Sequence, residues 1–442
     1  MNPSGVPARI LDAWKGTDVV ELSTMPALLL ALAVIVLLAR LLGALARRLG
    51  QPPVIGEILG GILLGPTLFG GAITRVLFPT DVRSILTTLA NVGVVVFMFL
   101  VGLELDRGLL RGQGRIAVTL SLSAMVVPFA LGSLLALYLF DHHPTPHRLA
   151  FVLFLGTAMA VTAFPVLARI LTDKGLIDTP IGGLALACAS VDDVMAWSLL
   201  AVVVALAGAG TVPWSVLLVV PFAAALLLVV RPALARLAAR GPTSAGGRAG
   251  GPLAAAAVLV AVSAGLWLSA EATDRMGLHL IFGAFLFGVA MPRDGAVVLR
   301  EKALPWIRQI CAVVLLPVFF MVAGIKVDLS SMSGTALGEL GLVLLVAIVG
   351  KFAGAFVGAR LNGVRVRHST VLAILINTRG LTELVVLTVG LQLAVLDTQL
   401  YSLMVVMALV TTAMAGVLLP VVYPERRVRE DRAAAHAVLT RS

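Results

Sequence analysis

The sequence has few charged and few aromatic residues for its length. Only 13% of its 442 residues are charged and 6% are aromatic, whereas 60% are hydrophobic. Soluble domains are about half apolar and about a quarter charged, so this composition excludes an ordinary soluble domain. The alternating apolar segments of about 10 residues that build outer-membrane barrels are also absent. The apolar runs are continuous and about 20 residues long, which predicts an all-α polytopic membrane protein.

Several chemical motifs are missing as well. The two cysteines, Cys188 and Cys311, fall in apolar runs, without metal-ligand spacing and without support for a disulfide. No Gly-rich phosphate-binding loop ending in Gly-Lys-Ser/Thr occurs, so uphill transport would depend on an ion gradient. No Ser/His/Asp or metal-ligand set indicates an enzyme, and we expect no cofactor. We interpret His142, His143 and His147 as part of a solvated loop between helices rather than as a metal site.

Apolar runs predict about thirteen transmembrane spans. The second and ninth are short and Gly-rich, and a Gly/Pro/Ser-rich linker at 241–252 joins the seventh to the eighth. The predicted spans are 26–46, 53–70, 84–103, 115–139, 149–171, 180–207, 213–235, 252–270, 278–292, 306–327, 336–360, 369–394 and 399–422.

The net charge of +10 is best explained by membrane topology. With the N-terminus outside, 24 of the 33 Lys and Arg residues lie in cytoplasmic connections or at the adjoining span ends, seven lie in outside connections or at their span ends, and two, Lys351 and Arg379, lie well within spans. This is the distribution that the positive-inside rule requires, so we expect no nucleic-acid partner. Residues 1–25 do not resemble a cleaved signal peptide, and we assign them to an extracytoplasmic segment. Residues 26–422 form the transmembrane domain, and 423–442 form a short basic cytoplasmic tail.

Two adjacent carboxylates, Asp192 and Asp193, lie in an apolar run long enough to cross a bilayer. A charge at the bilayer centre costs about 3 kcal/mol even on insertion scales, so the pair predicts a functional site. Successive helical residues point about 100° apart, so only one aspartate can face a given partner. The natural cation is Lys351, which lies in GKFAGAFVG on a small-residue face that permits close helix approach.

Two predicted spans carry polar or helix-breaking residues in mid-membrane. The fifth has Pro165 with Thr157 and Thr162, and the twelfth contains Asn377–Gly380. Interrupted helices expose backbone dipoles and carbonyls, as in the ion sites of secondary transporters. Because these spans are seven apart, they cross in opposite directions. Spans 2–6 and 9–13 are therefore predicted to be two inverted five-helix repeats, each with a discontinuous fourth helix.

Eight segments together resemble the monovalent cation:proton antiporter-2 family, and more closely its CHX-type branch. The likeness covers roughly residues 26–422. The segments are GEILGGILLGPTLFG (56–70), FMFLVGLELD (97–106), TAMAVTAFPVLARIL (157–171), ASVDDVMAW (189–197), GAFLFGVAMP (283–292), LLPVFFMVAGIKVDL (315–329), GKFAGAF (350–356) and NTRGLTELVVL (377–387).

This resemblance implies an NhaA-like fold in a plasma-membrane protein, with a mobile core sliding against a dimerisation domain, and hence a homodimer. It implies that Asp193 is the main cation and proton carrier, that Asp192 pairs with Lys351, and that Thr157 and Thr162 lie where the broken helices cross. The span-5 break has no acidic residue. We therefore expect Arg379 and Glu383, four residues apart, to compensate the helix dipoles there.

The predicted function is exchange of Na⁺ or K⁺ for protons by alternating access. A carboxylate beside another carboxylate in a low-dielectric cavity can hold a proton near neutral pH, and a monovalent cation competes for the same site. An exporter of a larger solute on this scaffold, such as an ionophore, is the main alternative, which the low aromatic content disfavours. A channel is disfavoured by the buried lysine and the inverted repeats.

Overall fold

Every regular element in the described chain is a helix, as the composition predicts. The computed structural model describes residues 24–68, 71–104, 114–177, 179–209, 218–240, 252–276, 278–292, 304–330, 332–424, 426–428 and 430. The predicted N-terminal segment is therefore described only at residues 24–25, and the predicted cytoplasmic tail only at residues 423, 424, 426–428 and 430. The linker predicted at 241–252 lies outside them except for its last residue.

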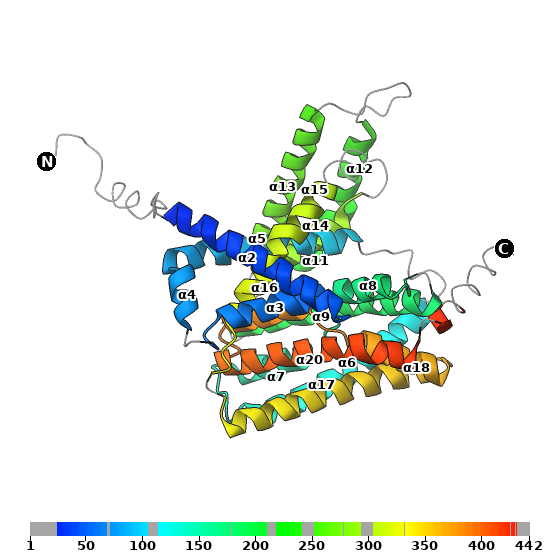
Figure 1. Ribbon diagram of the computed structural model, residues 1–442. Coiled ribbons are helices and arrows are strands. Elements are labelled where there is room, and N and C mark those ends of the chain that lie inside the picture. The colour runs from blue at the N-terminus through cyan, green and yellow to red at the C-terminus, as the bar shows by residue number, and fades with distance from the viewer. Residues whose placement is uncertain are drawn as a thin grey trace, which may run out of the picture.

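The helices form two groups in space (Figure 1). The first, which we call the scaffold group, contains α2 (Thr24–Arg48), α3 (Pro53–Leu64), α5 (Thr80–Glu104), α13 (Pro252–Arg275), α14 (Leu280–Ala290), α15 (Leu304–Ile310), the π-helical turn η4 (Cys311–Leu315) and α16 (Leu316–Ile325). The short α4 (Ala72–Leu77) and the segment α11 (Val219–Ala225), η2 (Leu226–Val230) and α12 (Arg231–Arg240) accompany it.

The second, which we call the core group, holds the residues singled out in the sequence. It contains α6 (Gly114–Leu139), α7 (Arg148–Ala160), α8 (Phe164–Asp173), α9 (Pro180–Ala209), α17 (Gly334–Leu361), α18 (Val366–Ile376), α19 (Leu381–Gln392) and α20 (Thr398–Val422). The two groups meet mainly where α19 faces α16 and where α20 faces α3.

Glycines let helices within each group approach closely. A Cβ on Gly324 of α16 would lie 2.5 Å from the Ile58 carbonyl oxygen of α3, which is far inside van der Waals contact. On α17, a Cβ on Gly354 would lie equally close to the Ser123 carbonyl oxygen of α6. The small-residue face predicted on α17 therefore packs directly against α6, as such faces do between membrane helices.

Nine segments of the described chain are long and apolar enough to cross a membrane, or ten when the bent pair α18–α19 counts as one span. The predicted spans 53–70 and 278–292 coincide with α3 and α14, which are apolar but too short for that test, and the predicted span 252–270 coincides with α13. The helices α3 and α14 have only 12 and 11 residues. A polytopic helical architecture is thus confirmed, whereas the number thirteen remains a prediction.

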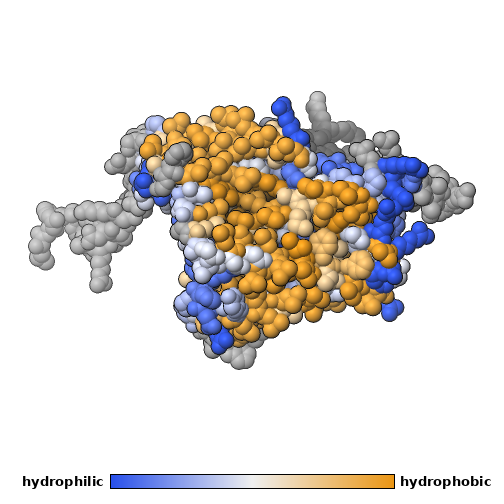
Figure 2. All heavy atoms as spheres, turned by 60° about the horizontal axis from the view of Figure 1, so that its bottom comes forward, coloured by the Kyte–Doolittle hydropathy of each residue, from blue (hydrophilic) through white to orange (hydrophobic). Residues whose placement is uncertain are grey.

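The outer surface is apolar over a broad band. Figure 2 shows this band between hydrophilic edges on the face that includes the core group. The helices α6 and α17 carry exposed large hydrophobic side chains, including Leu122, Val126, Leu345 and Val349. A continuous apolar surface of this kind is unfavourable in water and suits contact with lipid chains.

Candidate functional site

The fifth predicted span is interrupted just before its proline. The helix α7 ends at Ala160, residues 161–163 are non-helical, and α8 begins at Phe164. Because Pro165 lies in the first turn of α8, where its missing N–H breaks no intrahelical bond, it starts a helix rather than kinking one. The twelfth span is interrupted at 377–380, between α18 and α19, with a bend of 42°. Both predicted interruptions are confirmed.

The two interruptions touch each other. The Ala163 N–H donates to the Thr378 carbonyl oxygen at 3.1 Å, and the Thr162 hydroxyl lies 3.1 Å from the Ile376 carbonyl oxygen. Backbone groups that each helix leaves unpaired at its break are thus satisfied by the other break. We call this region the crossing.

Arg379 binds the end of α7. It is fully buried, its Nη1 donates to the Ala158 carbonyl oxygen at 2.7 Å and its Nη2 donates to the Met159 carbonyl oxygen at 2.6 Å. A cation at the C-terminus of a helix is stabilised by the helix dipole. The same Nη1 lies 3.0 Å from Glu383 Oε1, and Glu383 occupies the first turn of α19, where a negative charge is favourable. The predicted pair is present, although Arg379 itself lies in the break rather than on the helix.

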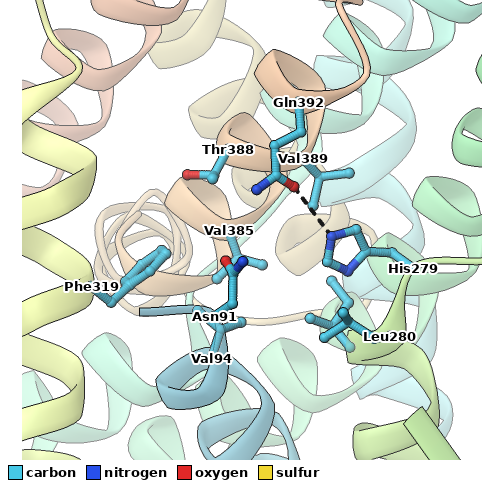
Figure 3. Close-up of a pocket in the computed structure, with 10 residues that line it drawn as sticks. Asn91, Val94, His279, Leu280, Phe319, Val385, Thr388, Val389 and Gln392 are labelled. Carbon is cyan, nitrogen blue, oxygen red and sulfur yellow. Dashed lines mark hydrogen bonds between the residues drawn. The ribbon is translucent and has the colours of Figure 1, made fainter. Parts of the chain in front are cut away.

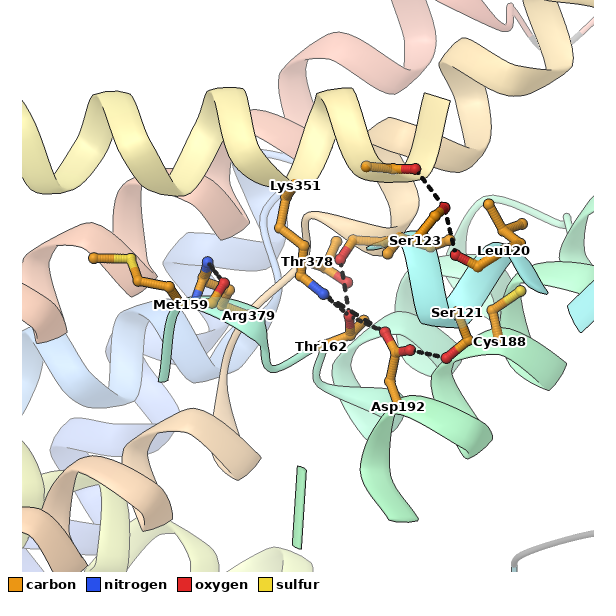
Figure 4. Close-up of polar contacts among 12 residues, drawn as sticks. Leu120, Ser121, Ser123, Met159, Thr162, Cys188, Asp192, Lys351, Thr378 and Arg379 are labelled. Carbon is orange, nitrogen blue, oxygen red and sulfur yellow. Dashed lines mark hydrogen bonds and ion pairs between the residues drawn. The ribbon is translucent and has the colours of Figure 1, made fainter. Parts of the chain in front are cut away.

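Asp192 is surrounded by donors from three other elements (Figure 4). Lys351 Nζ lies 3.5 Å from Asp192 Oδ2 and donates to the Thr162 hydroxyl at 2.7 Å. The Thr162 hydroxyl lies 2.6 Å from the same Oδ2, and the Ser121 hydroxyl donates to Oδ1. Thr162 has a single hydroxyl proton, so it donates either to Asp192 or to the Ile376 carbonyl. Lys351 is fully buried and therefore does not extend to an interface.

Asp193 has a different environment. It is only 1% exposed, and its Oδ1 has no hydrogen-bond partner among the described residues. It also makes no ion pair with any of them, although Asp192 and Lys351 are close enough to influence it electrostatically. A buried ionised carboxylate without a partner is strongly disfavoured, so this side chain requires a proton, a cation or water.

The buried charges near the crossing do not balance. Three carboxylates and two cations are buried there in the described chain, and the cations are taken by Asp192 and Glu383. Asp193 is therefore the carboxylate that no protein cation neutralises. Such an arrangement leaves room for one exchangeable positive charge.

One predicted site residue is not joined to this cluster by a hydrogen bond. Thr157 is buried near the end of α7, where its hydroxyl donates to the Leu153 carbonyl oxygen at 2.7 Å, one turn earlier. Ser121, by contrast, was not among the predicted site residues. It is a buried polar residue in an apolar run, and that pattern could have singled it out.

The interpretation of 142–147 as a wholly solvated loop is wrong for His143. His143 is 3% exposed, and its two ring nitrogens face Asp397 Oδ2 at 2.5 Å and Glu339 Oε2 at 3.2 Å. Two carboxylates that lie 58 residues apart in the chain meet this ring, which no local pattern indicates. Among the described residues no group of His, Cys, Asp and Glu is arranged to hold a metal ion, and both cysteines are free and buried.

The transmembrane sodium/hydrogen exchanger family model matches residues 33–423. The chain belongs to this family. It is 36% identical over 413 residues to the Na(+)/H(+) antiporter NhaS4 of Synechocystis, covering 91% of this chain and 99% of the relative. It is also 36% identical over 417 residues to cation/H(+) antiporter 20 of Arabidopsis thaliana, covering 90% of this chain and 48% of the relative. The resemblance to the CHX-type branch is therefore confirmed, and the family is one of transporters rather than enzymes.

The chain spans about half the length of several curated relatives, including the plant antiporter just described. The fold is similar to that of the sodium proton antiporter MjNhaP1 from Methanocaldococcus jannaschii at pH 8. The TM-score is 0.65 with 16% identity, over 92% of this chain and 99% of that one. At this level of identity the likeness concerns the fold alone.

Proposed function

We propose that this chain exchanges a monovalent cation, Na⁺ or K⁺, for protons, with Asp193 as the group that carries either ion. The observation that supports this most directly is the buried Asp193 carboxylate without a protein cation, beside an Asp192 whose charge Lys351 offsets. Relatives named as Na(+)/H(+) and K(+)/H(+) antiporters support the same substrates.

The coupling follows from electrostatics. A domain carrying an ionised Asp193 through an apolar barrier would pay a large desolvation cost, whereas a bound cation or proton removes most of that cost. If the core group crosses only with one of the two ions bound, exchange is obligatory. Thr162 would hold the backbone of the crossing in place, and Asp192 would hold Lys351. Arg379 and Glu383 would neutralise the charges of the helix ends.

The architecture proposed with this function is a set of thirteen spans with two inverted five-helix repeats. The core group would move against the scaffold group to expose Asp193 to each side in turn. We also propose a homodimer in the plasma membrane, with the N-terminus outside and the C-terminus in the cytoplasm. Two cavities that border the scaffold in the described chain have volumes of about 190 and 250 Å³, below the ~300–1,000 Å³ of small-molecule sites, which favours small ions over a larger solute.

The proposal is tested in everted vesicles that hold a preformed pH gradient. Adding Na⁺, K⁺ or Li⁺ should dissipate the gradient with wild-type protein, and Asp193→Asn should abolish this response while the protein still inserts. Ser198→Ala changes an exposed polar residue of the same helix and should leave exchange intact. Retention of more than a third of the wild-type rate by Asp193→Asn would contradict the role of Asp193.

A further inference from the structure

A cavity of about 190 Å³ lies between the scaffold and core groups. Its walls come from the start of α3, from α8, from the η4–α16 segment and from the first residue of α19. The lining is mostly apolar, with Pro53, Val166 and Phe320 among its residues, and contains one acidic and one basic side chain, Glu57 and Arg169. We call it the Glu57 cavity. It has room for several water molecules.

Glu57 is not neutralised by the neighbouring protein. It makes no hydrogen bond and no ion pair with another described residue, whereas Arg169 is engaged by Asp173 on its own helix at 3.2 Å. Arg40, Arg169 and Arg47 attract Glu57 only at longer range, without a direct ion pair. A carboxylate in a mostly apolar cavity is therefore free to attract a cation.

The Glu57 cavity extends towards the crossing. Val166 lies three residues after the break between α7 and α8, and Leu381 directly follows the break between α18 and α19. Towards the other end of α19, the corresponding space is small, and Figure 3 shows the residues that line it. There a pocket of only about 10 Å³ is bordered by Asn91, and His279 Nε2 lies 3.4 Å from Gln392 Oε1. Among the cavities of the described residues, access to the crossing is therefore wider from the face that carries the α2–α3 turn.

We propose that Glu57 forms a second cation-binding site, in which a partly hydrated monovalent cation is held in the Glu57 cavity before it reaches Asp193. This proposal rests on the exchange function proposed above. The carboxylate supplies the charge, and the cavity volume lets the ion keep most of its waters, so binding is weak enough for the ion to leave again. Arg169, on the opposite wall, opposes the same cation and limits its occupancy.

Two substitutions test this assignment: one removes a negative charge from the cavity and the other removes a positive charge. In vesicles of both orientations, Glu57→Gln should raise the cation KM at least about fivefold from the face with the α2–α3 turn, because one negative charge is lost. The maximal rate and the KM from the other face should stay within about twofold. Arg169→Gln should lower the KM from the same face. Arg275→Gln is the control, since it breaks an equivalent exposed pair with Glu271 at 2.9 Å outside the cavity.

The outcomes separate this inference from the function on which it rests. Normal wild-type exchange with an unchanged KM in both cavity variants would overturn the role of Glu57 and leave the exchange function standing. Equal KM changes from both faces, or the same change in Arg275→Gln, would also overturn it. Absence of wild-type exchange would overturn both proposals. If Glu57→Gln does not insert, the lowered KM of Arg169→Gln decides the question, because that residue is half-exposed.

Discussion

Lys351 is a buried cation that contacts a carboxylate and a hydroxyl group. Its Nζ has Asp192 Oδ2 at 3.5 Å and the Thr162 hydroxyl at 2.7 Å, and the side chain has no exposed surface. Removal of one partner of a buried pair leaves the other charge uncompensated, whereas removal of both avoids that cost. Substitution of this lysine should therefore lower the stability of the protein more than it lowers the rate of transport.

Lys351→Ala is expected to destabilise the protein by about 3–5 kcal/mol. The loss should be larger at high pH, where a buried carboxylate that has lost its cation is hardest to accommodate. Melting curves in detergent over a pH series would measure this. Asp192→Asn combined with Lys351→Gln should recover part of the stability. A loss that is independent of pH, without recovery in the double variant, would contradict the pairing.

His143 should give the protein a second dependence on pH. Burial lowers the pKa of His143, but hydrogen bonds from its ring to Asp397 and Glu339 outweigh burial and raise the pKa above 6.5. A raised folded-state pKa stabilises the protein fully below the unfolded value of about 6.5, and the stabilisation is lost as pH rises through the folded value. Both ring nitrogens can donate only in the imidazolium form, which agrees with this direction.

His143→Gln is therefore expected to lower stability by about 1.5–3 kcal/mol at pH 6, the range for hydrogen bonds to charged groups. The difference from wild type should shrink towards pH 9. His142→Gln is the control, because its side chain is 49% exposed and lies 3.9 Å from Glu339. Equal effects of the two substitutions in thermal melts would show that the buried ring does not bridge the carboxylates.

The contact between the helices α6 and α17 depends on a glycine, which has no side chain to hold the two backbones apart. An added Cβ on Gly354 would lie 2.5 Å from the Ser123 carbonyl oxygen and 3.1 Å from the Ala124 Cα, so the helices would have to separate. Gly341, on the same helix, has nothing within 4 Å of the same position. Alanine substitutions at these two glycines therefore distinguish the effect of close packing from the effect of helix propensity.

Gly354→Ala should cost about 1–3 kcal/mol through overpacking. Gly341→Ala should be neutral or stabilising, because alanine favours a helix by up to about 1 kcal/mol over glycine. Unfolding of both variants in mixed micelles by increasing denaturant would measure the difference. If the two substitutions had the same effect, close approach of α6 and α17 would not depend on Gly354.

The sequence predicted where two helices are interrupted but not what the interruptions contact. Pro165 and the run Asn377–Gly380 break helical patterns locally, so their positions are readable in the sequence. The bond from the Ala163 N–H to Thr378 joins segments more than 200 residues apart, and no local pattern encodes it. The same reason explains why the contact of Ser121 with Asp192 was not predicted. The π-helical turns η2 and η4 lie within continuous apolar runs, which do not distinguish them from α-helix.

The orientation of the whole molecule is tested through the two ends of α17. Thr335 lies in the first turn of this helix of 28 residues, Arg365 lies four residues after its end, and both are exposed. The distribution of Lys and Arg predicts Thr335 outside and Arg365 inside. In a variant without Cys188 and Cys311, Thr335→Cys should react with an impermeant thiol reagent in intact cells, and Arg365→Cys should react only after permeabilisation. Labelling of both from the same side would contradict the predicted topology.

The division into two groups of helices has a consequence for how the protein tolerates mutation. Within each group, backbone meets backbone at glycines, so random substitution there should be damaging even far from any ion. Between the groups, longer side chains such as Phe319 of α16, near α19, and Gln51 of the α2–α3 turn, near Gly416 of α20, fill the space and can be exchanged for others of similar size. Variants that survive selection for altered transport speed should therefore accumulate along this boundary, while the glycine contacts on either side stay fixed.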